Sequence, residues 1–129
     1  MFTVYKERIF SAAHQVLEPD GTLEPVHGHN WRLKVHVSAR GLDQRAMVID
    51  FHHLDRVMTE VLSPFEGRLL NDVPPFHDTS PTAENVARHL FETIARRIDD
   101  DRVRVRRVEL WETEDACAIF ERPPSGIES

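Results

Sequence analysis

The sequence of 129 residues contains one cysteine, Cys117, so no disulfide bond can form within the chain. A reducing compartment such as the cytoplasm is therefore expected. No apolar run approaches the length needed to span a membrane, and the first residues lack a secretory signal pattern. Lysine is scarce, with only Lys6 and Lys34, but arginine supplies ordinary basic charge. The net charge of −6 disfavours non-specific nucleic-acid binding. These features indicate a cytoplasmic protein with no nucleic-acid or membrane partner.

The length and composition are those of one soluble globular domain. The chain is 40% hydrophobic and 29% charged, which is ordinary for such proteins. No internal repeat or linker divides it. We expect residues 1–123 to form the single domain, and we expect the Pro-, Ser- and Gly-containing residues 124–129 to form a flexible C-terminal tail.

Two periodicities indicate the secondary structure. β-forming residues fill 2–11, and strict alternation of apolar and polar side chains over 29–38 marks a second strand. This alternation places His29 on the apolar face and His36 on the polar face. Two further strands are expected at 104–112 and 117–121, where Cys117 is expected to be a buried core thiol.

Helical spacing of apolar residues predicts two amphipathic helices between these pairs of strands. The first is expected over about 51–62, with Asp50 as its N-cap. The second is expected to extend to Ile98, with Ser80 as its N-cap and Pro81 at its first position. The acidic run that starts at Asp99 is expected just outside this helix, because it opposes the dipole of a helix C-terminus.

The resulting order is strand, strand, helix, helix, strand, strand. Two amphipathic helices that cover one face of a four-stranded antiparallel sheet form an α+β fold. So small a sheet leaves its edge strands open. Closure of several subunits into a β-barrel would cover these edges, which favours a cyclic oligomer.

The triplet His27-Gly28-His29, with His14 upstream, is the most informative motif. Side chains two positions apart on a strand share a face, so His27 and His29 can converge. A third imidazole from a neighbouring segment completes a face of three nitrogen ligands, which is typical of a catalytic zinc site with an open position. The alternative is a set of ordinary surface histidines. His29 argues against it, because it ends an apolar stripe where burial requires a partner such as a metal.

Six short motifs in a fixed order resemble the 6-pyruvoyl-tetrahydropterin synthase family, which includes the 6-carboxy-tetrahydropterin synthases of queuosine biosynthesis. They are FSAAH at 10–14, HGHNW at 27–31, MVIDF at 47–51, LNDVP at 70–74, PTAEN at 81–85 and Glu112-Thr113. The resemblance spans residues 2–121. It implies the tunnelling fold, or T-fold, assembled as a homo-hexamer of two stacked trimers that form a barrel.

The resemblance also implies a zinc ion and a pterin-like ligand. The zinc ligands it implies are His14, His27 and His29. Glu112 matches the glutamate that anchors the pterin ring, since a carboxylate can accept two parallel hydrogen bonds from the ring. Thr82 matches a threonine of the same pocket, and Thr113 follows the anchor as a further ligand-binding residue. Without the resemblance, a solvated strand end is the simpler interpretation of Glu112, and for Thr82 a local cap is nearly as good an interpretation as ligand contact.

The chain departs from the family at the proton relay. Usual members place a cysteine shortly before the first histidine of the His-Gly-His motif, and an aspartate and a histidine activate it. Here residues 21–26 contain no cysteine, and the other two positions hold Glu66 and Gly67. The standard relay cannot be assembled from these positions, which indicates a changed mechanism or a lost activity.

Glu24, three residues before His27, is a candidate replacement base. A variant branch of the family uses a glutamate in this region and shortens the pterin side chain to 6-hydroxymethyl-dihydropterin. A carboxylate near a metal can act as a general base when burial raises its pKa. The equal alternative is a solvated loop glutamate. His77 could also enter the site, although an exposed loop histidine is the simpler interpretation.

Three functions remain open. The one we favour is a divergent family member that binds a pterin-like ligand and does not catalyse the standard synthase reaction. The second is a zinc-dependent lyase that acts on a dihydroneopterin triphosphate-like substrate, with Glu24 as general base and a 6-hydroxymethyl, 6-carboxy or 6-pyruvoyl product. The third is an enzyme that acts on another pterin- or purine-like ligand.

Overall fold

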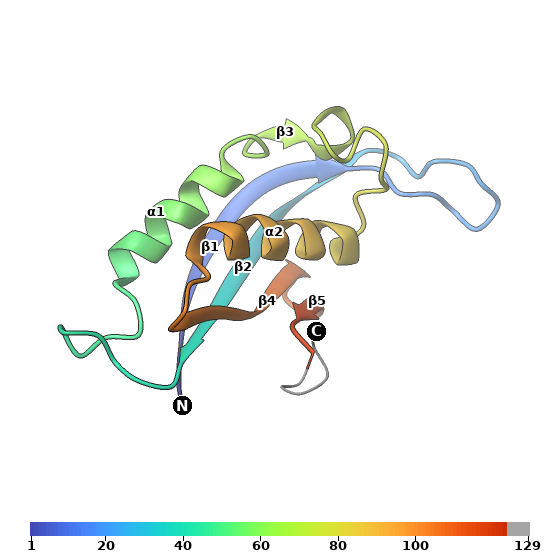
Figure 1. Cartoon of the computed structure of the whole chain (residues 1–129). Coiled ribbons are helices and arrows are strands. Elements are labelled where there is room, and N and C mark those ends of the chain that lie inside the picture. Colours follow the sequence, from blue (N-terminus) through green and yellow to red (C-terminus); the bar gives the residue numbers. More distant parts are fainter. Residues whose placement is uncertain (124–129) are drawn as a thin grey trace.

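A twisted sheet of five strands forms the centre of the computed structural model, which describes residues 1–123 (Figure 1). The predicted tail, 124–129, lies outside the described residues. The strand order is β3-β1-β2-β4-β5. The strand bounds are β1 (Phe2–His14), β2 (His27–Ala39), β3 (Arg68–Leu69), β4 (Val103–Thr113) and β5 (Ala116–Glu121). The four long strands are antiparallel, as predicted.

The prediction of only four strands is wrong, because β3 adds a fifth. Its two residues pair in parallel with Ala12 and Ala13 of β1. Gly67 turns the chain onto this edge with a φ of 71°, a conformation that glycine adopts at little cost. A strand of two residues is too short to show any alternation, so the pattern could not reveal it.

Both helices lie on the same face of the sheet, as predicted (Figure 1). Helix α1 spans Phe51–Leu62, and the Asp50 side chain caps it by accepting a hydrogen bond from the His52 backbone N–H. Helix α2 spans Ala83–Ile98. Within residues 1–123, neither helix is long and apolar enough to cross a membrane.

The predicted N-cap of α2 is wrong by two residues. Thr82 is the cap, because its hydroxyl accepts the Asn85 backbone N–H at 3.1 Å. Ser80 lies before the helix, and its backbone carbonyl accepts a hydrogen bond from the Asn85 side chain. Pro81 therefore precedes the helix and is not its first residue.

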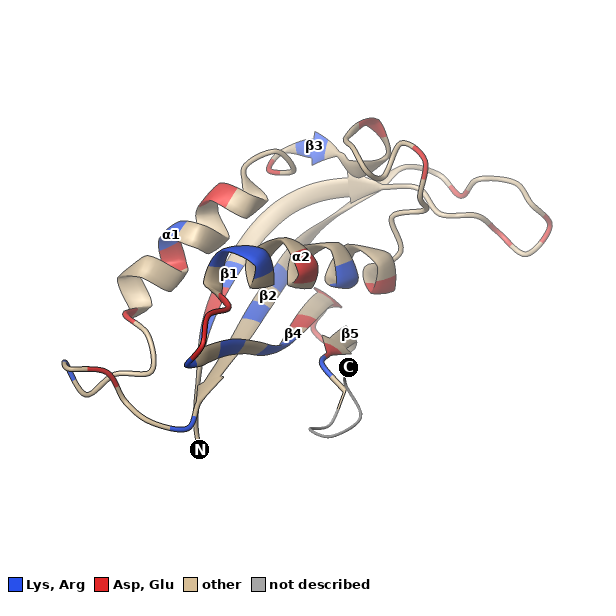
Figure 2. Cartoon of the chain, in the orientation of Figure 1, with Lys and Arg blue, Asp and Glu red and all other residues tan. Residues whose placement is uncertain are grey.

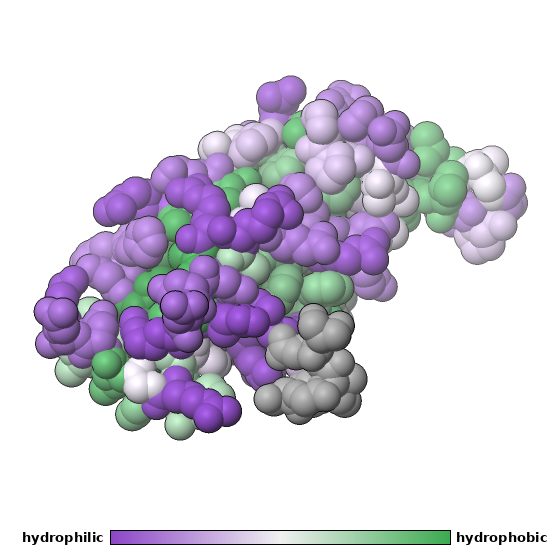
Figure 3. All heavy atoms as spheres, viewed as in Figure 1, coloured by the Kyte–Doolittle hydropathy of each residue, from purple (hydrophilic) through white to green (hydrophobic). Residues whose placement is uncertain are grey.

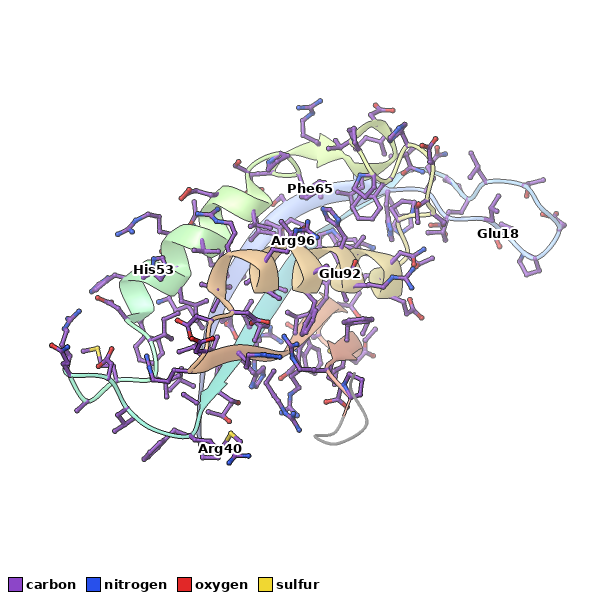
Figure 4. The ribbon with its side chains drawn as sticks, in the orientation of Figure 1. Glu18, Arg40, His53, Phe65, Glu92 and Arg96 are labelled. Atoms are coloured by element: carbon purple, nitrogen blue, oxygen red, sulfur yellow. The ribbon has the colours of Figure 1, made fainter. Side chains whose placement is uncertain are left out.

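The apolar stripe of β2 forms the middle of the core. Trp31, Leu33, Val35 and Val37 are fully buried between the sheet and the helices. Figure 3 shows hydrophobic residues along the seam between α1 and α2, whereas hydrophilic residues cover most of the visible surface. In Figure 2, basic and acidic residues are mixed along both helices. His53 lies exposed on α1, as Figure 4 illustrates.

The other face of the sheet carries no helix. Cys117 is exposed, not buried in the core as predicted. Alternation along β5 points Ala118 and Phe120 toward the core and Cys117 away from it. His36 lies on this face as predicted. It is nevertheless buried, because it stacks against Tyr5 and its Nε2 lies 2.6 Å from Glu109.

Candidate metal centre

Strands β1 and β2 bring three imidazoles together near one end of the sheet. His14 is the cross-strand partner of His27, and His29 is the partner of Ala12. Because these residues are spaced by two along antiparallel strands, all three side chains emerge on the face that carries the helices. One nitrogen atom from each ring lies within 4.8 Å of those from the other two, so the three histidines can hold a metal ion.

Backbone carbonyls fix the orientation of two of these rings. His14 Nδ1 lies 2.8 Å from the Pro81 carbonyl oxygen, and His27 Nδ1 lies 3.1 Å from that of Pro25. Each Nδ1 therefore donates, which leaves Nε2 as the lone-pair atom of a neutral ring. These two Nε2 atoms lie 3.1 Å apart. Facing lone pairs at this distance are stabilised by a cation between them.

His29 completes the set and lacks an alternative partner. Its Nε2 is buried and has no hydrogen-bond partner among the described residues. Burial lowers the pKa of the His29 imidazole; the nearby Glu112 carboxylate opposes this shift in part, and the neighbouring His14 and His27 rings add to it. The ring is thereby held in the neutral form that binds metals.

The three donors fit zinc. Imidazole nitrogens around a tetrahedral zinc ion lie about 3.3 Å apart, given Zn–N bonds of about 2.0–2.1 Å. The separation of 3.1 Å between His14 and His27 is close to that value. The unpartnered buried nitrogen of His29, with Nε2 of His14 and of His27, is the donor set that a zinc ion with an open position requires.

Glu112 lies directly beside the histidines. The register between β4 and β5 shifts between Trp111 and Thr113, and this irregularity leaves Glu112 without a cross-strand partner on β5. Its Oε1 lies 3.2 Å from His14 Nε2 and 3.7 Å from His29 Nε2. Position and charge make it available to a ligand bound next to the three rings.

Two pockets meet at Glu112. The first, of about 240 Å³, is also lined by His14, Glu24, His27 and Thr82. The second, of about 340 Å³, is lined by Arg32, Trp111, Thr113 and others on the helix-free face. Thr82 is thus both a helix cap and a pocket residue. Thr113 lies in the second pocket, where its hydroxyl donates to Asp115 at 2.9 Å.

Glu24 lies beside the histidines, a placement that its sequence position left open. It lies within the segment that links β1 to β2, and its Oε1 lies 3.5 Å from His27 Nδ1. The same oxygen accepts the Val16 backbone N–H at 3.1 Å. Its side chain is only 20% exposed. These contacts and this exposure are not those of a solvated loop glutamate.

The other candidates do not join the cluster. Glu66 accepts the Ser11 backbone N–H at 2.7 Å, so it holds the edge of the sheet together. Gly67 occupies the left-handed conformation that side-chain-bearing residues rarely adopt. His77 is half exposed, and its Nε2 lies 3.2 Å from Asp78.

Several participants were not predicted from the sequence. The carbonyls of Pro25 and Pro81 orient the rings, but a backbone carbonyl has no residue signature. Glu84 lines the first pocket. Its place in the PTAEN motif, two residues after Thr82, is the signal that could have revealed it.

Comparison with known proteins agrees with this geometry. The chain matches the 6-pyruvoyl tetrahydropterin synthase family over residues 3–123. A protein of Archaeoglobus fulgidus, provisionally named a 6-carboxy-5,6,7,8-tetrahydropterin synthase, is 34% identical over 113 residues, which cover 88% of this chain and 90% of the relative.

Two solved structures have the same fold. The 6-pyruvoyl tetrahydropterin synthase of Caenorhabditis elegans superposes with a TM-score of 0.77 at 28% identity, covering 95% of this chain and 98% of the other. A Plasmodium vivax 6-pyruvoyltetrahydropterin synthase, described as a catalytic-residue mutant in which glutamate is replaced by alanine, gives a TM-score of 0.74 at 16% identity, with 94% and 97% coverage. Because the family match extends over residues 3–123, this chain belongs to the 6-pyruvoyl tetrahydropterin synthase family.

Proposed function

We propose that this protein binds a 6-substituted dihydropterin beside a zinc ion and acts as a lyase on the pterin side chain, with Glu24 as general base. The observation that carries this proposal is the position of the Glu24 carboxylate. It lies 3.5 Å from His27 and in the same pocket as Glu112. A base must lie within reach of the substrate atoms that the metal side of the pocket would hold.

Each residue has one role in this proposal. His14, His27 and His29 hold the zinc, which as a Lewis acid would acidify the hydroxyl and C–H groups of the side chain. Glu112 accepts hydrogen bonds from the pyrimidine N–H and amino groups of the ring, and so selects rings that carry both donors. Glu24 takes up the proton, Thr82 lines the same pocket as Glu24, and Thr113 lines the second pocket at Glu112.

The standard relay is not available to this chain. The family positions that supply its acidic residue and histidine are occupied here by Glu66, which bonds the edge of β1, and by Gly67. Cys117 is exposed on the helix-free face and is not among the residues that line either pocket at Glu112. A glutamate is a catalytic residue in the Plasmodium vivax relative, which supports a glutamate as base in this fold. We therefore expect a product other than the standard one.

A pterin-binding protein without turnover is the second candidate. The observation that favours it is Gly67, because nothing at that position can assist proton transfer from the pocket. In this case Glu112 and the metal would position a pterin that is released unchanged. The two candidates share the same ligand and differ only in the chemistry at Glu24.

Assembly as a homo-hexamer of two stacked trimers, located in the cytoplasm, belongs to the same proposal. The support is the open sheet. Along β1, only Ala12 and Ala13 pair with β3, and the outer edge of β5 has no partner among the described residues. Edges of this kind are normally covered, and pairing between subunits would close them into a barrel.

The test is a product analysis with dihydroneopterin triphosphate. Purified protein would be assayed for zinc, incubated with the substrate, and its pterin products separated. Formation of 6-hydroxymethyl-dihydropterin that Glu24→Gln abolishes would support the lyase. A 6-pyruvoyl or 6-carboxy product would contradict the inference that the standard proton relay is not available to this chain. Binding without any product would leave the second candidate, and absence of binding would exclude both.

A further inference from the structure

A side-chain amide clamps the chain next to the metal centre. Asn71 lies in the short helix η1 (Leu70–Asp72), 56 residues away from Gln15 in sequence. Its Oδ1 accepts the Gln15 backbone N–H at 2.9 Å, and its Nδ2 donates to the Gln15 carbonyl at 3.0 Å. One amide therefore satisfies both backbone groups of the residue that follows His14.

Asn71 extends the pairing of β1 with β3 as far as Gln15, with hydrogen bonds from its side chain in place of backbone ones. Backbone pairing joins Ala12 to Arg68 and Ala13 to Leu69, and the same spacing brings Asn71 opposite Gln15. The chain has entered η1 at this point, so its backbone can no longer pair with β1. Asn71 is not used to cap its own helix, because the N-cap of η1 is Leu69 without a side-chain hydrogen bond. The amide is directed entirely at Gln15.

From Gln15 the hydrogen bonds lead to Glu24. Gln15 Nε2 donates to the Glu24 carbonyl at 3.0 Å. The Val16 N–H donates to Glu24 Oε1 at 3.1 Å, and the Glu24 N–H donates to the Val16 carbonyl at 3.0 Å. These three bonds fix both the backbone and the carboxylate of Glu24. The rest of this segment projects from the body of the protein (Figure 1). Its apolar residues Leu17, Leu23 and Val26 are exposed, so few other contacts hold it.

We propose that Asn71 is a positioning residue that, through Gln15, holds both His14 and Glu24 in place. The proposal rests on the proposed function for the role of Glu24, but its structural part can be tested separately. Asn71 is not among the residues that line either pocket at Glu112. Its effect on chemistry is therefore indirect and acts through two routes that different variants can separate.

The first route is tested by Asn71→Leu, which removes both hydrogen bonds to Gln15. We expect hydrogen exchange of the Gln15, Val16 and Glu24 amides to speed up about tenfold or more. Cobalt(II) affinity should fall about tenfold, because His14 adjoins the clamped residue and lost supporting contacts weaken metal sites by that order. Unchanged exchange at these amides would overturn the proposal.

The second route is tested by Gln15→Met, which keeps the clamp but removes the donor to Glu24. We expect only the Val16 and Glu24 amides to exchange faster, and cobalt affinity to stay within about twofold of the wild type. The control is Phe76→Leu, in the same connection between β3 and α2. Phe76 packs against Phe65 and His89 and should alter neither measurement. An equal effect of this control would show general loosening and would refute the clamp.

Kinetics with dihydroneopterin triphosphate test the catalytic part. Both variants should lower kcat about tenfold with KM within about twofold, since misplacement of a base affects the chemical step. Combined with Glu24→Gln, Gln15→Met should not lower kcat further, because it acts only through Glu24. A full multiplicative loss in this double variant would contradict positioning of Glu24. If the wild type converts no dihydropterin, the proposed function fails, and amide exchange and cobalt affinity alone decide the clamp.

Discussion

The Nε2 atoms of His14 and His27 face each other at 3.1 Å, while both Nδ1 atoms point at backbone carbonyls. The relationship depends on strand register, because His14 and His27 are direct cross-strand partners. A slip of one residue would turn the imidazoles of one strand to the other face of the sheet. The apolar alternation of β2, which includes Trp31 and Leu33, fixes that register by burial. The metal centre is therefore positioned by the core.

Replacement of one of these rings should remove the metal site. We expect His29→Ala to weaken zinc binding at least about tenfold, because two imidazoles remain where three converge. Zinc should raise the melting temperature of the wild type, since a ligand that binds the folded state stabilises it, and should not raise that of the variant. Metal analysis and thermal unfolding with and without zinc measure both effects.

His77→Ala is the matched control for this substitution. His77 is half exposed in the loop before α2, and its Nε2 lies 3.2 Å from Asp78. Zinc content equal to that of the wild type is expected. Loss of zinc in this variant would place His77 in the site, against the geometry of the three clustered histidines.

The cluster of three histidines that could hold a metal could be predicted because strands impose a simple geometry. Spacing by two places His27 and His29 on one face whatever the rest of the chain does, and the apolar alternation after His29 identifies that face. The proposed role of Glu24 could not be separated from a solvated loop in this way. Its position depends on hydrogen bonds to Gln15 and Val16, which no periodicity encodes.

The three features that differ from the sequence-based predictions have similar causes. Strand β3 is held by the turn at Gly67 and by pairing with Ala12 and Ala13, so it has no pattern of its own. Ser80 and Thr82 are both good caps, and only the bond from the Asn85 N–H distinguishes them, so the sequence alone does not place the cap of α2. Residue type favours a buried Cys117, but β5 is an edge strand with one face uncovered, and Cys117 lies on that face.

Glu112→Gln should weaken pterin binding without loss of the metal. A glutamine can accept only part of the paired hydrogen bonds that a carboxylate accepts, and a charge-assisted hydrogen bond contributes about 1.5–3 kcal/mol. We expect affinity for a dihydropterin to fall about tenfold to a hundredfold, as measured by calorimetric titration, with zinc content unchanged.

Glu92→Gln provides the control for charge removal. Glu92 is exposed on α2 and lines neither pocket at Glu112, and its place on the helix is labelled in Figure 4. Its affinity for the pterin should equal that of the wild type. If Glu112→Gln bound the pterin as tightly as the wild type, Glu112 would not be the residue that anchors the ring.

Thr82→Ala should destabilise the fold by about 1 kcal/mol, the ordinary cost of losing an N-cap. Thr82→Ser keeps the hydroxyl that accepts the Asn85 N–H and should retain most of the stability. Ser80→Ala should cost little, because only the backbone carbonyl of Ser80 is used. Urea unfolding of the three variants measures these differences, and a larger loss for Ser80→Ala than for Thr82→Ala would reverse the assignment.

His89 should make stability fall at acidic pH. Its ring packs edge-on against Phe65 and Phe76, with centroids 5.8 and 5.5 Å away, and burial lowers the pKa of the imidazole. Below the unfolded-state pKa of about 6.5, the unfolded chain takes up a proton that the folded ring resists. The free energy of unfolding therefore decreases as the pH falls from about 6.5 toward the lowered pKa of the folded state.

His89→Leu removes this titration and keeps an apolar side chain between the two phenylalanines. Because other histidines titrate in the same range, the informative quantity is the difference in unfolding free energy between variant and wild type. Urea unfolding in a metal chelator at pH 7.5 and 5.5 measures it. We expect the difference to shift in favour of the variant at the lower pH, since only the wild type loses the contribution of a neutral His89. An identical difference at both pH values would show that the ring is protonated as easily in the folded state as in the unfolded chain, against its burial between Phe65 and Phe76.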